Sequence, residues 1–423
     1  MLKLYQYHTF SFLLMLMFML LIFSGCLTPG DIQRAPDTAD VPADSTPDFD
    51  DHGLFAEPTP KPEKRETRLS FLAAGDNIIH SSIYYDAEQR ARGMEGVRYN
   101  FWDIYAGPVA DMITAADISF INQETPIAGD EFPRNGYPNF NTPREAAYAL
   151  VEMGFDIVNL ANNHMIDVGG ETGYRNQLDF WDSKPVLHIG GFRNREDYDT
   201  IRIFKRDGIS IAFLSYTYGT NGMTLPPGSE MVIPLIDPVE IRRQLILAQG
   251  KADLLFVHIH WGHEDWHVPN TQQIELAQLL ARYNVDVVIG THPHVLQPVV
   301  WLDRPDGGRT LVAYSIGNFI SAQLNGRNML GALLGFDIVR TVEDTVQIEN
   351  VKITPIVTHY NRQIRDISLH LFEDYTEELL ADHGAHHRRG GGRFTMRQLE
   401  DIIRQTISEE FLSEYYRKRL FGE

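Results

Sequence analysis

The stretch Asp286-Val-Val-Ile-Gly-Thr-His-Pro-His-Val-Leu-Gln-Pro298 sets two histidines directly behind a short apolar run. Residues 287–290 are aliphatic and end in a glycine, which is typical of a strand buried on both faces. Pro293 lies between the two imidazoles, excludes a helix and favours an extended backbone before it. The pattern predicts His292 and His294 at the carboxyl end of a strand, where open α/β sheets place their ligands. Taken alone, the pair is also compatible with a turn that carries two solvated rings.

Length and charge limit the classes of function. The chain has 423 residues, which by length alone suggests about two or three domains. It carries 57 acidic residues against 37 basic ones, a net charge of -20, and this argues against nucleic acid or an anionic membrane surface as a partner. A polyanionic substrate stays compatible with the charge, because a bound metal would supply local positive charge.

The first residues resemble a targeting signal. An apolar run at 10–23 is short for a transmembrane helix and stops at Ser24-Gly25-Cys26, which resembles a bacterial lipoprotein signal. We expect residues 1–26 to be the signal peptide, Cys26 to be lipidated, and residues 27–67 to be a disordered tether. The alternative is an uncleaved membrane anchor, and both interpretations place the remainder on the extracytoplasmic face of the bacterial cell membrane. Cys26 is the only cysteine, so neither an intramolecular disulfide nor a thiolate metal site is expected.

Apolar runs and segments of helical period alternate from residue 68 onward. Strands are predicted at 68–76, 117–124, 155–161, 209–216, 253–260, 286–290 and 310–316, and helices at 108–116, 143–153, 238–249 and 271–283. This order indicates βαβ units, and so an α/β fold with a largely parallel sheet and helices on both faces. Residues 331–340 and 345–353 alternate enough to form an antiparallel pair that closes a domain at 68–364.

The last part of the chain, 365–423, is predicted to be a helical C-terminal extension. Residues 395–419 have apolar positions near helical spacing. The stretch His386-His-Arg-Arg-Gly-Gly-Gly392 precedes them. Its histidines could bind a metal, but a solvated linker is the favoured interpretation.

Polar residues of two kinds follow the predicted strands. They are all oxygen or imidazole donors, namely Asp76, Glu124, Asn163, His164, His260, His292 and His294. Parallel strands end at one edge of a sheet, so these side chains are expected to converge there. A pair of divalent cations about 3.5–4 Å apart needs such a set, with one carboxylate between the ions. The donors suit manganese, iron or zinc, whereas a calcium site would hold more carboxylates.

The motifs occur in an order that resembles the CapA family, the poly-gamma-glutamate capsule synthesis proteins. They are Gly75-Asp76, Asn122-Gln-Glu124, Asn162-Asn-His164 with Asp167 and Gly169, His260-Trp-Gly262 with Glu264, Gly290-Thr-His-Pro-His-Val-Leu-Gln297 and Tyr314-Ser-Ile-Gly-Asn-Phe319. They run across roughly residues 69–320. That family in turn resembles the calcineurin-like metallophosphoesterases, whose fold is a four-layer α/β/β/α sandwich. The resemblance, and not the periodicity, implies two sheets.

The resemblance also implies a role for each matching residue. The metal ligands would be Asp76, Glu124, Asn163, His260, His292 and His294. His164 would be the catalytic histidine, which donates a proton or a hydrogen bond to the leaving oxygen. One departure is that Asn77 and Ile78 follow Asp76, where the phosphoesterases have an Asp-x-His pair. His80 could substitute, although a surface histidine at a helix start is favoured, and the site would hold one or two divalent ions.

The remaining candidates have structural alternatives beside the functional ones. Asp76 and Asp167 could be helix caps. His258, on the same strand face as His260, is expected to fill the core or to orient a ligand. The residues expected to support a ligand or to contact substrate are Asp167, His258, Glu264, Gln297 and Asn318.

Three functions follow from the sequence. The first is a lipid-anchored protein for the synthesis, export or attachment of an anionic envelope polymer of the poly-gamma-glutamate type, and the resemblance implies membrane capsule-synthesis subunits as partners. The second is a metallophosphoesterase that hydrolyses a phosphate ester of an envelope glycopolymer or a nucleotide. The third is a subunit without catalysis that binds polymer in the same site. Nucleic acid is not an expected partner.

Overall fold

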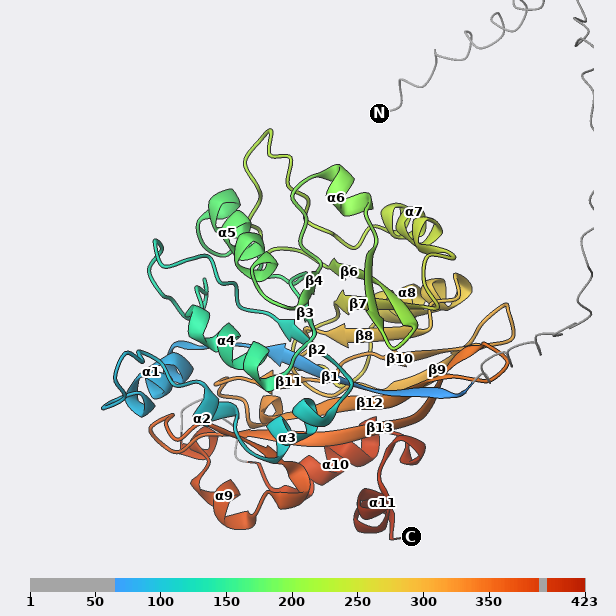
Figure 1. Ribbon diagram of the computed structural model, residues 1–423. Helices are drawn as coiled ribbons and strands as arrows, with labels where there is room; N and C mark the ends of the chain where they lie inside the picture. Colours follow the sequence, from blue (N-terminus) through green and yellow to red (C-terminus); the bar gives the residue numbers. More distant parts are fainter. Residues whose placement is uncertain (1–64, 388–393, 423) are drawn as a thin grey trace, which may run out of the picture. The chain divides into compact units, whose positions relative to one another are not determined.

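Two β-sheets face each other in the computed structural model, which describes residues 65–387 and 394–422 (Figure 1). The first sheet has the order β14 (Ser368–Leu371), β13 (Val346–His359), β12 (Leu330–Arg340), β1 (Thr67–Asn77), β2 (Ile118–Gln123), β3 (Ile157–Asn159) and β4 (Leu187–Ile189), and β11 (Asn318–Ile320) also pairs with β1. The second has the order β5 (Arg202–Arg206), β6 (Ile209–Thr217), β7 (Leu254–His260), β8 (Val287–Thr291), β10 (Arg309–Ala313) and β9 (Val299–Asp303).

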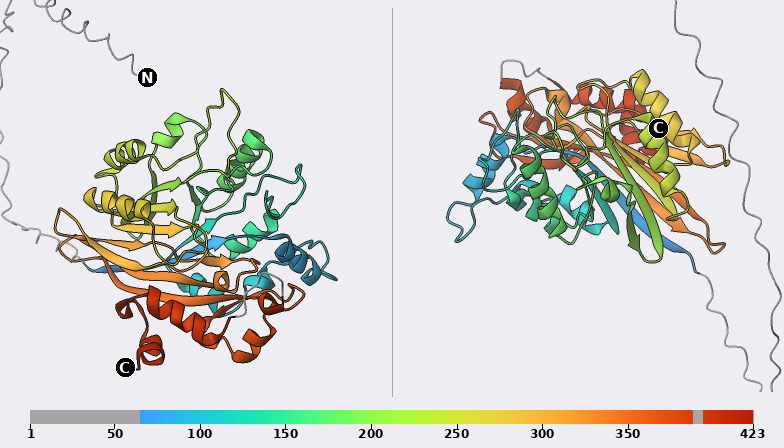
Figure 2. Two further views of the ribbon diagram at one scale, coloured as in Figure 1. Left: turned by 180° about the vertical axis from the view of Figure 1, so that it is seen from behind. Right: turned by 90° about the horizontal axis from the view of Figure 1, so that it is seen from above.

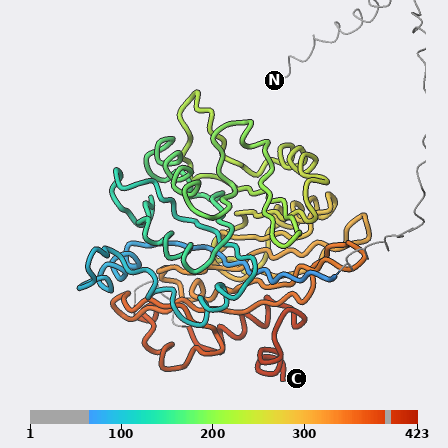
Figure 3. Tube along the Cα trace, viewed as in Figure 1, coloured from blue at the N-terminus to red at the C-terminus, as the bar shows by residue number. Residues whose placement is uncertain are grey.

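The first sheet has a parallel half and an antiparallel half, and the second has a parallel centre between two antiparallel edge strands. Strands β1 to β4 are parallel to one another, as are β6, β7, β8 and β10. Strand β12 lies antiparallel beside β1 although most of the chain separates them, as the orange and blue segments of Figure 3 show. The parallel pairing predicted from the alternation of strands and helices is therefore present, but it is divided between the two sheets that the family resemblance implied. Alternating patterns identify strands, but they do not say which strands pair.

Aromatic side chains fill the space between the sheets. Phe71 on β1 meets Phe256 on β7 edge to face, with ring centroids 5.3 Å apart, and Phe256 also meets Phe336 on β12 at 5.8 Å. All three rings are buried, and burial of each stabilises the fold by about 1.5–3 kcal/mol. These contacts hold the two sheets together as the inner layers of the sandwich.

Helices cover the two outer faces and the ends. They are α1 (Ser81–Arg90), α2 (Trp102–Tyr105), α3 (Pro108–Ala115), α4 (Arg144–Met153), α5 (Gly170–Asp182), α6 (Arg195–Asp199), α7 (Pro238–Ala248), α8 (Thr271–Arg282), α9 (Glu377–Asp382), α10 (Met396–Thr406) and α11 (Glu414–Phe421). Helices α7 and α8 pack on the second sheet, and α10 and α11 lie along the outer face of the first (Figures 1 and 2). The α/β/β/α sandwich implied by the resemblance is confirmed.

The C-terminal segment contributes a strand as well as helices. Strand β14 pairs with β13 and extends the first sheet, while Leu399 and Ile403 of α10 are buried in the same core. The helical stretch predicted at 395–419 consists of two α-helices, because extended backbone at residues 407–408 and 412–413 separates them on either side of a 3-10 turn. His386 and His387 lie in a short 3-10 helix.

Two expectations from the sequence lie wholly or partly outside the described residues. These are the signal with Cys26 and the tether at 27–67, of which only the last residues are described. Within the described part of the chain, no helix is both long enough and apolar enough to span a bilayer.

Candidate metal centre

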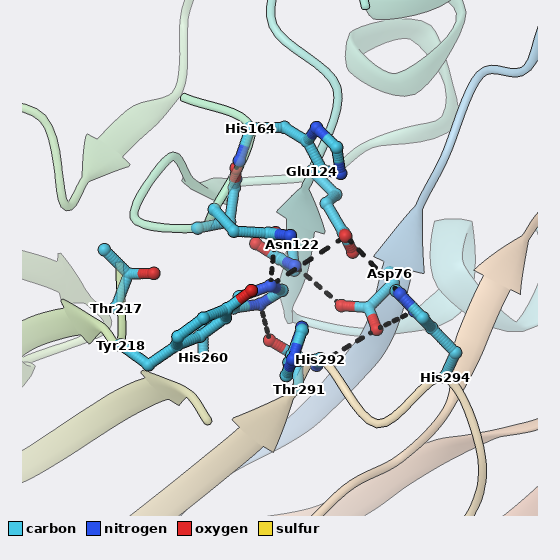
Figure 4. Close-up of polar contacts among 12 residues, drawn as sticks. Asp76, Asn122, Glu124, His164, Thr217, Tyr218, His260, Thr291, His292 and His294 are labelled. Carbon is cyan, nitrogen blue, oxygen red and sulfur yellow. Dashed lines mark hydrogen bonds and ion pairs between the residues drawn. The ribbon is translucent and has the colours of Figure 1, made fainter. Parts of the chain in front are cut away.

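Each sheet carries one row of polar side chains at the carboxyl ends of its parallel strands. In the first sheet Asp76 lies opposite Asn122 and Asn318 in the strand register. In the second, His260 lies opposite Thr217 and Thr291. The arrowheads of β1, β7 and β8 point to the same side of the molecule in Figure 1, so the two rows meet at one edge of the sandwich. Figure 4 shows the labelled side chains pointing toward one another there.

The backbone just before Asp76 packs tightly against the backbone of Gly317. A Cβ on Gly75 would lie 1.9 Å from the carbonyl oxygen of Gly317, which explains the glycine before the aspartate. Both oxygens of Asp76 are bonded: Oδ1 accepts from Asn122 Nδ2 at 2.7 Å, and Oδ2 accepts from the backbone of His292 at 3.2 Å. Burial acts to raise the pKa of Asp76, but these bonds and the nearby His294 ring outweigh it and hold the pKa below its usual value.

Glu124 has no such partners. The carboxyl group is buried, and neither oxygen has a hydrogen bond within the described chain. Its Oε1 lies 3.8 Å from His260 Nε2 and 3.7 Å from His294 Nε2. Burial, followed by the charge of Asp76, raises the pKa of Glu124 well above its usual value. A buried carboxylate without partners is unfavourable, and a cation between these three side chains would compensate it.

His260 is oriented by a chain of bonds through Thr291. The hydroxyl of Thr291 lies 2.8 Å from His260 Nδ1 and 2.9 Å from His258 Nε2, and His258 Nδ1 lies 3.1 Å from Ser215 Oγ. His258 therefore helps to orient His260 through Thr291, which is one of the two roles expected for it. Burial lowers the pKa of His258 to about 3 and that of His260 well below its usual value, so both rings are neutral at neutral pH. Neutral imidazole is the form that binds metals.

His292 and His294 leave the sheet through unusual backbone. Their φ angles are 96° and 58°, a region that residues other than glycine seldom adopt. Nδ1 of His294 lies 3.1 Å from both Asp76 Oδ2 and Asn318 Oδ1. Burial lowers the pKa of His292 to about 3; burial also acts on His294, but the bond to Asp76 outweighs it and raises that pKa. Nδ1 of His292 is buried and unpaired among the described residues.

Asn163 and His164 enter the site from the loop after β3. Asn163 Oδ1 lies 2.9 Å from His260 Nε2, so the amide oxygen faces the ligand set. His164 Nδ1 lies 2.6 Å from Asp167 Oδ2, which also accepts from the backbone of Phe140. Asp167 therefore holds the His164 ring. It does not cap α5, whose N-cap is Gly169, and Asp76 caps no helix.

The donors form two groups whose ligand atoms lie within 4.8 Å of one another: Asp76, Glu124 and His260, and then Glu264, His292 and His294. The first group is wholly buried, while Glu264 is exposed. Within the described chain this set lacks hydrogen-bond partners for both oxygens of Glu124 and for Nδ1 of His292. Two adjacent groups of oxygen and imidazole donors fit one or two divalent cations such as manganese, iron or zinc.

Thr291→Val tests the support of His260. The methyl group keeps the volume but removes the hydroxyl that bonds both His258 and His260. We expect the free energy of unfolding to fall by about 1–3 kcal/mol and metal affinity to fall about 10–100-fold. Denaturant unfolding and metal titration measure the two effects. Thr291→Ser, which retains the hydroxyl, should recover most of the affinity, and equal losses in both variants would contradict the role of the hydroxyl.

The loop after β6 contributes side chains that the motifs did not predict. The Tyr218 ring lies 4.5 Å from the ring of His292 and stacks near His260 at 6.3 Å. Asn221 Oδ1 accepts from Asn163 Nδ2 at 3.2 Å, and its Nδ2 lies 3.4 Å from His164 Nδ1. Asn221 therefore fixes which end of the Asn163 amide faces His260. The signal was present, because Thr217 and Tyr218 follow an apolar strand as the other ligands do.

Other candidates have structural partners. Gln297 is buried, accepts from Gln273 and donates to the backbone of Trp266 at 2.7 Å, so it anchors the 263–267 loop. Asn318 supports His294. His80 is the N-cap residue of α1 without a capping bond; its Nδ1 accepts from the backbone of Ala322. Ile78, at the position of the missing histidine, is buried and aliphatic and offers no ligand atom, while the preceding Asn77 bonds Gln123 and Tyr105.

The model of the bacterial capsule synthesis protein PGA_cap family matches residues 70–323, which include every donor described above. The chain belongs to this family. It is 30% identical over 204 residues to the capsule biosynthesis protein CapA of Bacillus anthracis, covering 47% of this chain and 48% of that protein. It is 29% identical over 223 residues to the PGA biosynthesis protein CapA of Bacillus subtilis (strain 168), covering 52% and 56%. The chain thus spans about half the length of the curated relatives it matches.

Two solved structures are similar to this chain at low sequence identity. A hypothetical protein from Thermus thermophilus is 19% identical, with a TM-score of 0.39, over 68% of this chain and 98% of that one. The calcineurin-like phosphoesterase YfkN from Bacillus subtilis is 11% identical, with a TM-score of 0.38, over 81% and 97%.

Proposed function

We propose that the chain acts in the synthesis, export or attachment of an anionic envelope polymer of the poly-gamma-glutamate type, through a metal-dependent site of the phosphoesterase kind. Family membership supports the part in capsule synthesis, and the name of the Bacillus subtilis relative supports the polymer type. The observation that carries the metal dependence is Glu124, a buried carboxylate whose two oxygens have no partner in the described chain and face two imidazoles.

Six side chains would hold the metal: Asp76, Glu124, Asn163, His260, His292 and His294, with Glu264 beside the last two. A divalent ion supplies Lewis-acid charge at a phosphoryl group and acidifies water. The chain itself contributes His164, whose Nδ1 is held by Asp167, leaving Nε2 to give a proton or a hydrogen bond to a leaving oxygen. Phe140 packs edge-on against that ring at 4.9 Å and limits its rotation.

The N-terminal sequence supports a location for this activity. The apolar run and Ser24-Gly25-Cys26 resemble a lipoprotein signal, so Cys26 would anchor the protein by lipid on the extracytoplasmic face of the bacterial cell membrane. Membrane subunits of a capsule-synthesis assembly would then be its partners.

Two alternatives use the same site. Hydrolysis of a phosphate ester of an envelope glycopolymer or nucleotide is favoured by the His164–Asp167 pair at 2.6 Å. Polymer binding without catalysis is favoured by Ile78, which stands where the phosphoesterases have a ligating histidine and offers no ligand atom.

Metal content and turnover separate these functions. The purified full-length chain is analysed for bound metal and assayed with a chromogenic phosphodiester before and after chelation, and again with added manganese or zinc. Bound metal, loss of turnover on chelation and its recovery on metal addition are expected for a catalytic site. Bound metal without turnover would favour the binding subunit. A chain that takes up no metal would contradict both catalytic proposals.

A further inference from the structure

Two arginines lie over a single tyrosine ring outside the metal centre. The guanidinium carbon of Arg98 is 5.3 Å from the centroid of Tyr99, and that of Arg134 is 5.1 Å from it. Arg134 Nη1 also donates to the Tyr99 hydroxyl at 2.6 Å. Tyr99 is buried, with 5% of its surface exposed. One fixed ring therefore contacts two cationic side chains.

The two positive charges are not neutralised by the protein. In the described part of the chain, neither Arg98 nor Arg134 forms an ion pair, in contrast to nearby Arg90 with Asp86 and Arg144 with Asp130. Glu88 is close enough to contribute to the raised pKa of Tyr99, after the larger effect of burial, but it bonds neither guanidinium. In a chain of net charge -20, two unpaired arginines on one ring place local positive charge within reach of an anionic polymer.

The segment that carries Arg134 also forms a wall of the metal centre. Asn135 pairs with Asn141 across its turn. Next to this pair, the Phe140 ring lies 4.9 Å from the His164 ring and 5.4 Å from that of His80, and the backbone of Phe140 donates to Asp167. Tyr137, at the turn, has 77% of its surface exposed and lies 6.4 Å from Phe140. One short segment therefore connects the arginine pair to the histidine proposed to assist the leaving oxygen.

We propose that Arg98 and Arg134 form a subsite for the carboxylates of an acidic polymer whose neighbouring units lie in the metal centre. The proposal rests on the proposed function and names a substrate contact for it. A guanidinium fork matches the two oxygens of a carboxylate. Because Tyr99 already holds both side chains, little rotamer freedom is lost when they bind, which favours affinity. An oligomer of gamma-linked glutamate offers a free carboxylate on every unit and is the occupant that this pair fits.

The test compares two substitutions that remove the same kind of contact. Arg98→Gln/Arg134→Gln removes the proposed subsite. Arg309→Gln is the control, because Arg309 lies 4.6 Å over the ring of Trp301 and forms no ion pair within the described chain. Arg309 begins β10, at the opposite end of the strands from the metal centre. Any effect that comes only from losing a cation–π contact should appear in both variants.

Binding of a fluorescent oligo-gamma-glutamate of about ten units to the full-length chain is measured at low and moderate salt. We expect the double variant to bind at least about tenfold more weakly, a loss of about 1.4 kcal/mol, with a smaller salt dependence. Arg309→Gln should bind like the wild type, and Arg98→Lys/Arg134→Lys should recover part of the affinity. Equal oligoglutamate binding by the wild type and the double variant would overturn the proposal, even if inorganic polyphosphate, titrated in parallel, bound the double variant more weakly.

The two proposals fail separately. If the wild-type chain hydrolyses the phosphodiester but does not bind oligoglutamate, the catalytic proposal stands and the subsite proposal is wrong. If the chain shows no turnover but its oligoglutamate binding depends on the two arginines, the subsite proposal stands and the catalytic proposal is wrong.

Discussion

Glu124→Gln is expected to stabilise the metal-free protein and to remove most of the stabilisation that metal provides. The Glu124 carboxyl is buried, and neither of its oxygens has a partner in the described chain. Replacing it by a neutral amide of similar size removes the cost of burying the carboxylate or of protonating it on folding, so the free energy of unfolding without metal should rise by about 1–3 kcal/mol. The amide binds cations weakly. The wild type gains about 2.7 kcal/mol when free metal is about 100 times its Kd, and the variant should gain little of this.

The stability of the metal-free protein should also depend on pH in a defined direction. Burial and Asp76 raise the pKa of Glu124 well above its usual 4.5, so the folded protein binds the proton more tightly than the unfolded chain does. Its contribution to stability is therefore present below about pH 4.5 and is lost as the pH rises toward the folded pKa. The metal-free wild type should lose stability over this window relative to Glu124→Gln. Denaturant unfolding with chelator at several pH values measures it.

Glu264→Gln is the matched control for Glu124→Gln. Glu264 belongs to the second donor group but is exposed. The same substitution there should change the stability of the metal-free protein by no more than about 0.5 kcal/mol. If Glu124→Gln were less stable than the wild type without metal, the carboxyl would have partners that the structure does not contain, and the main reason to place a cation beside it would disappear.

The strands that could be predicted are the ones with buried, aliphatic centres. β1, β2, β6, β7, β8, β12 and β13 lie where the apolar runs placed them. Edge strands were missed: β5 reads Arg-Ile-Phe-Lys-Arg and is mostly half exposed, so it has no clear apolar run. β10 was predicted too long, at 310–316, because the chain leaves the second sheet after Ala313 and re-enters the first as β11. A pattern along the chain does not record such a crossing.

The convergence of the candidate ligands was predictable for a physical reason, and several of the contacts that support them were not. Asp76, His260 and His292 each follow or end a strand, and parallel strands end at one edge, so the sequence alone implies that they meet. Asn122 donates to Asp76 because the two lie opposite each other on neighbouring strands, and Asn221 reaches Asn163 across 58 positions of sequence. Lateral register and loop paths decide these contacts. Neither has a local signal in the sequence.

His164→Gln is expected to lower turnover of a phosphodiester by about 10²–10⁴-fold while leaving metal content unchanged. His164 is held through Nδ1 by Asp167 at 2.6 Å and packs edge-on to Phe140 at 4.9 Å, so contacts within the protein set its position. Its proposed contact is with the leaving oxygen and not with the metal. The variant should therefore retain the metal-dependent rise in unfolding midpoint that Glu124→Gln loses.

The leaving group distinguishes a proton donor at His164 from a structural residue. A donor matters most when the departing oxygen is basic, so the loss in His164→Gln should be large for an alkyl phosphodiester and much smaller for a nitrophenyl one. Asp167→Asn, which weakens the hold on Nδ1 but leaves the imidazole, should give a smaller loss with the same dependence. A loss in kcat of equal size for both substrates would contradict the assignment, because misfolding or displaced metal would slow every substrate alike.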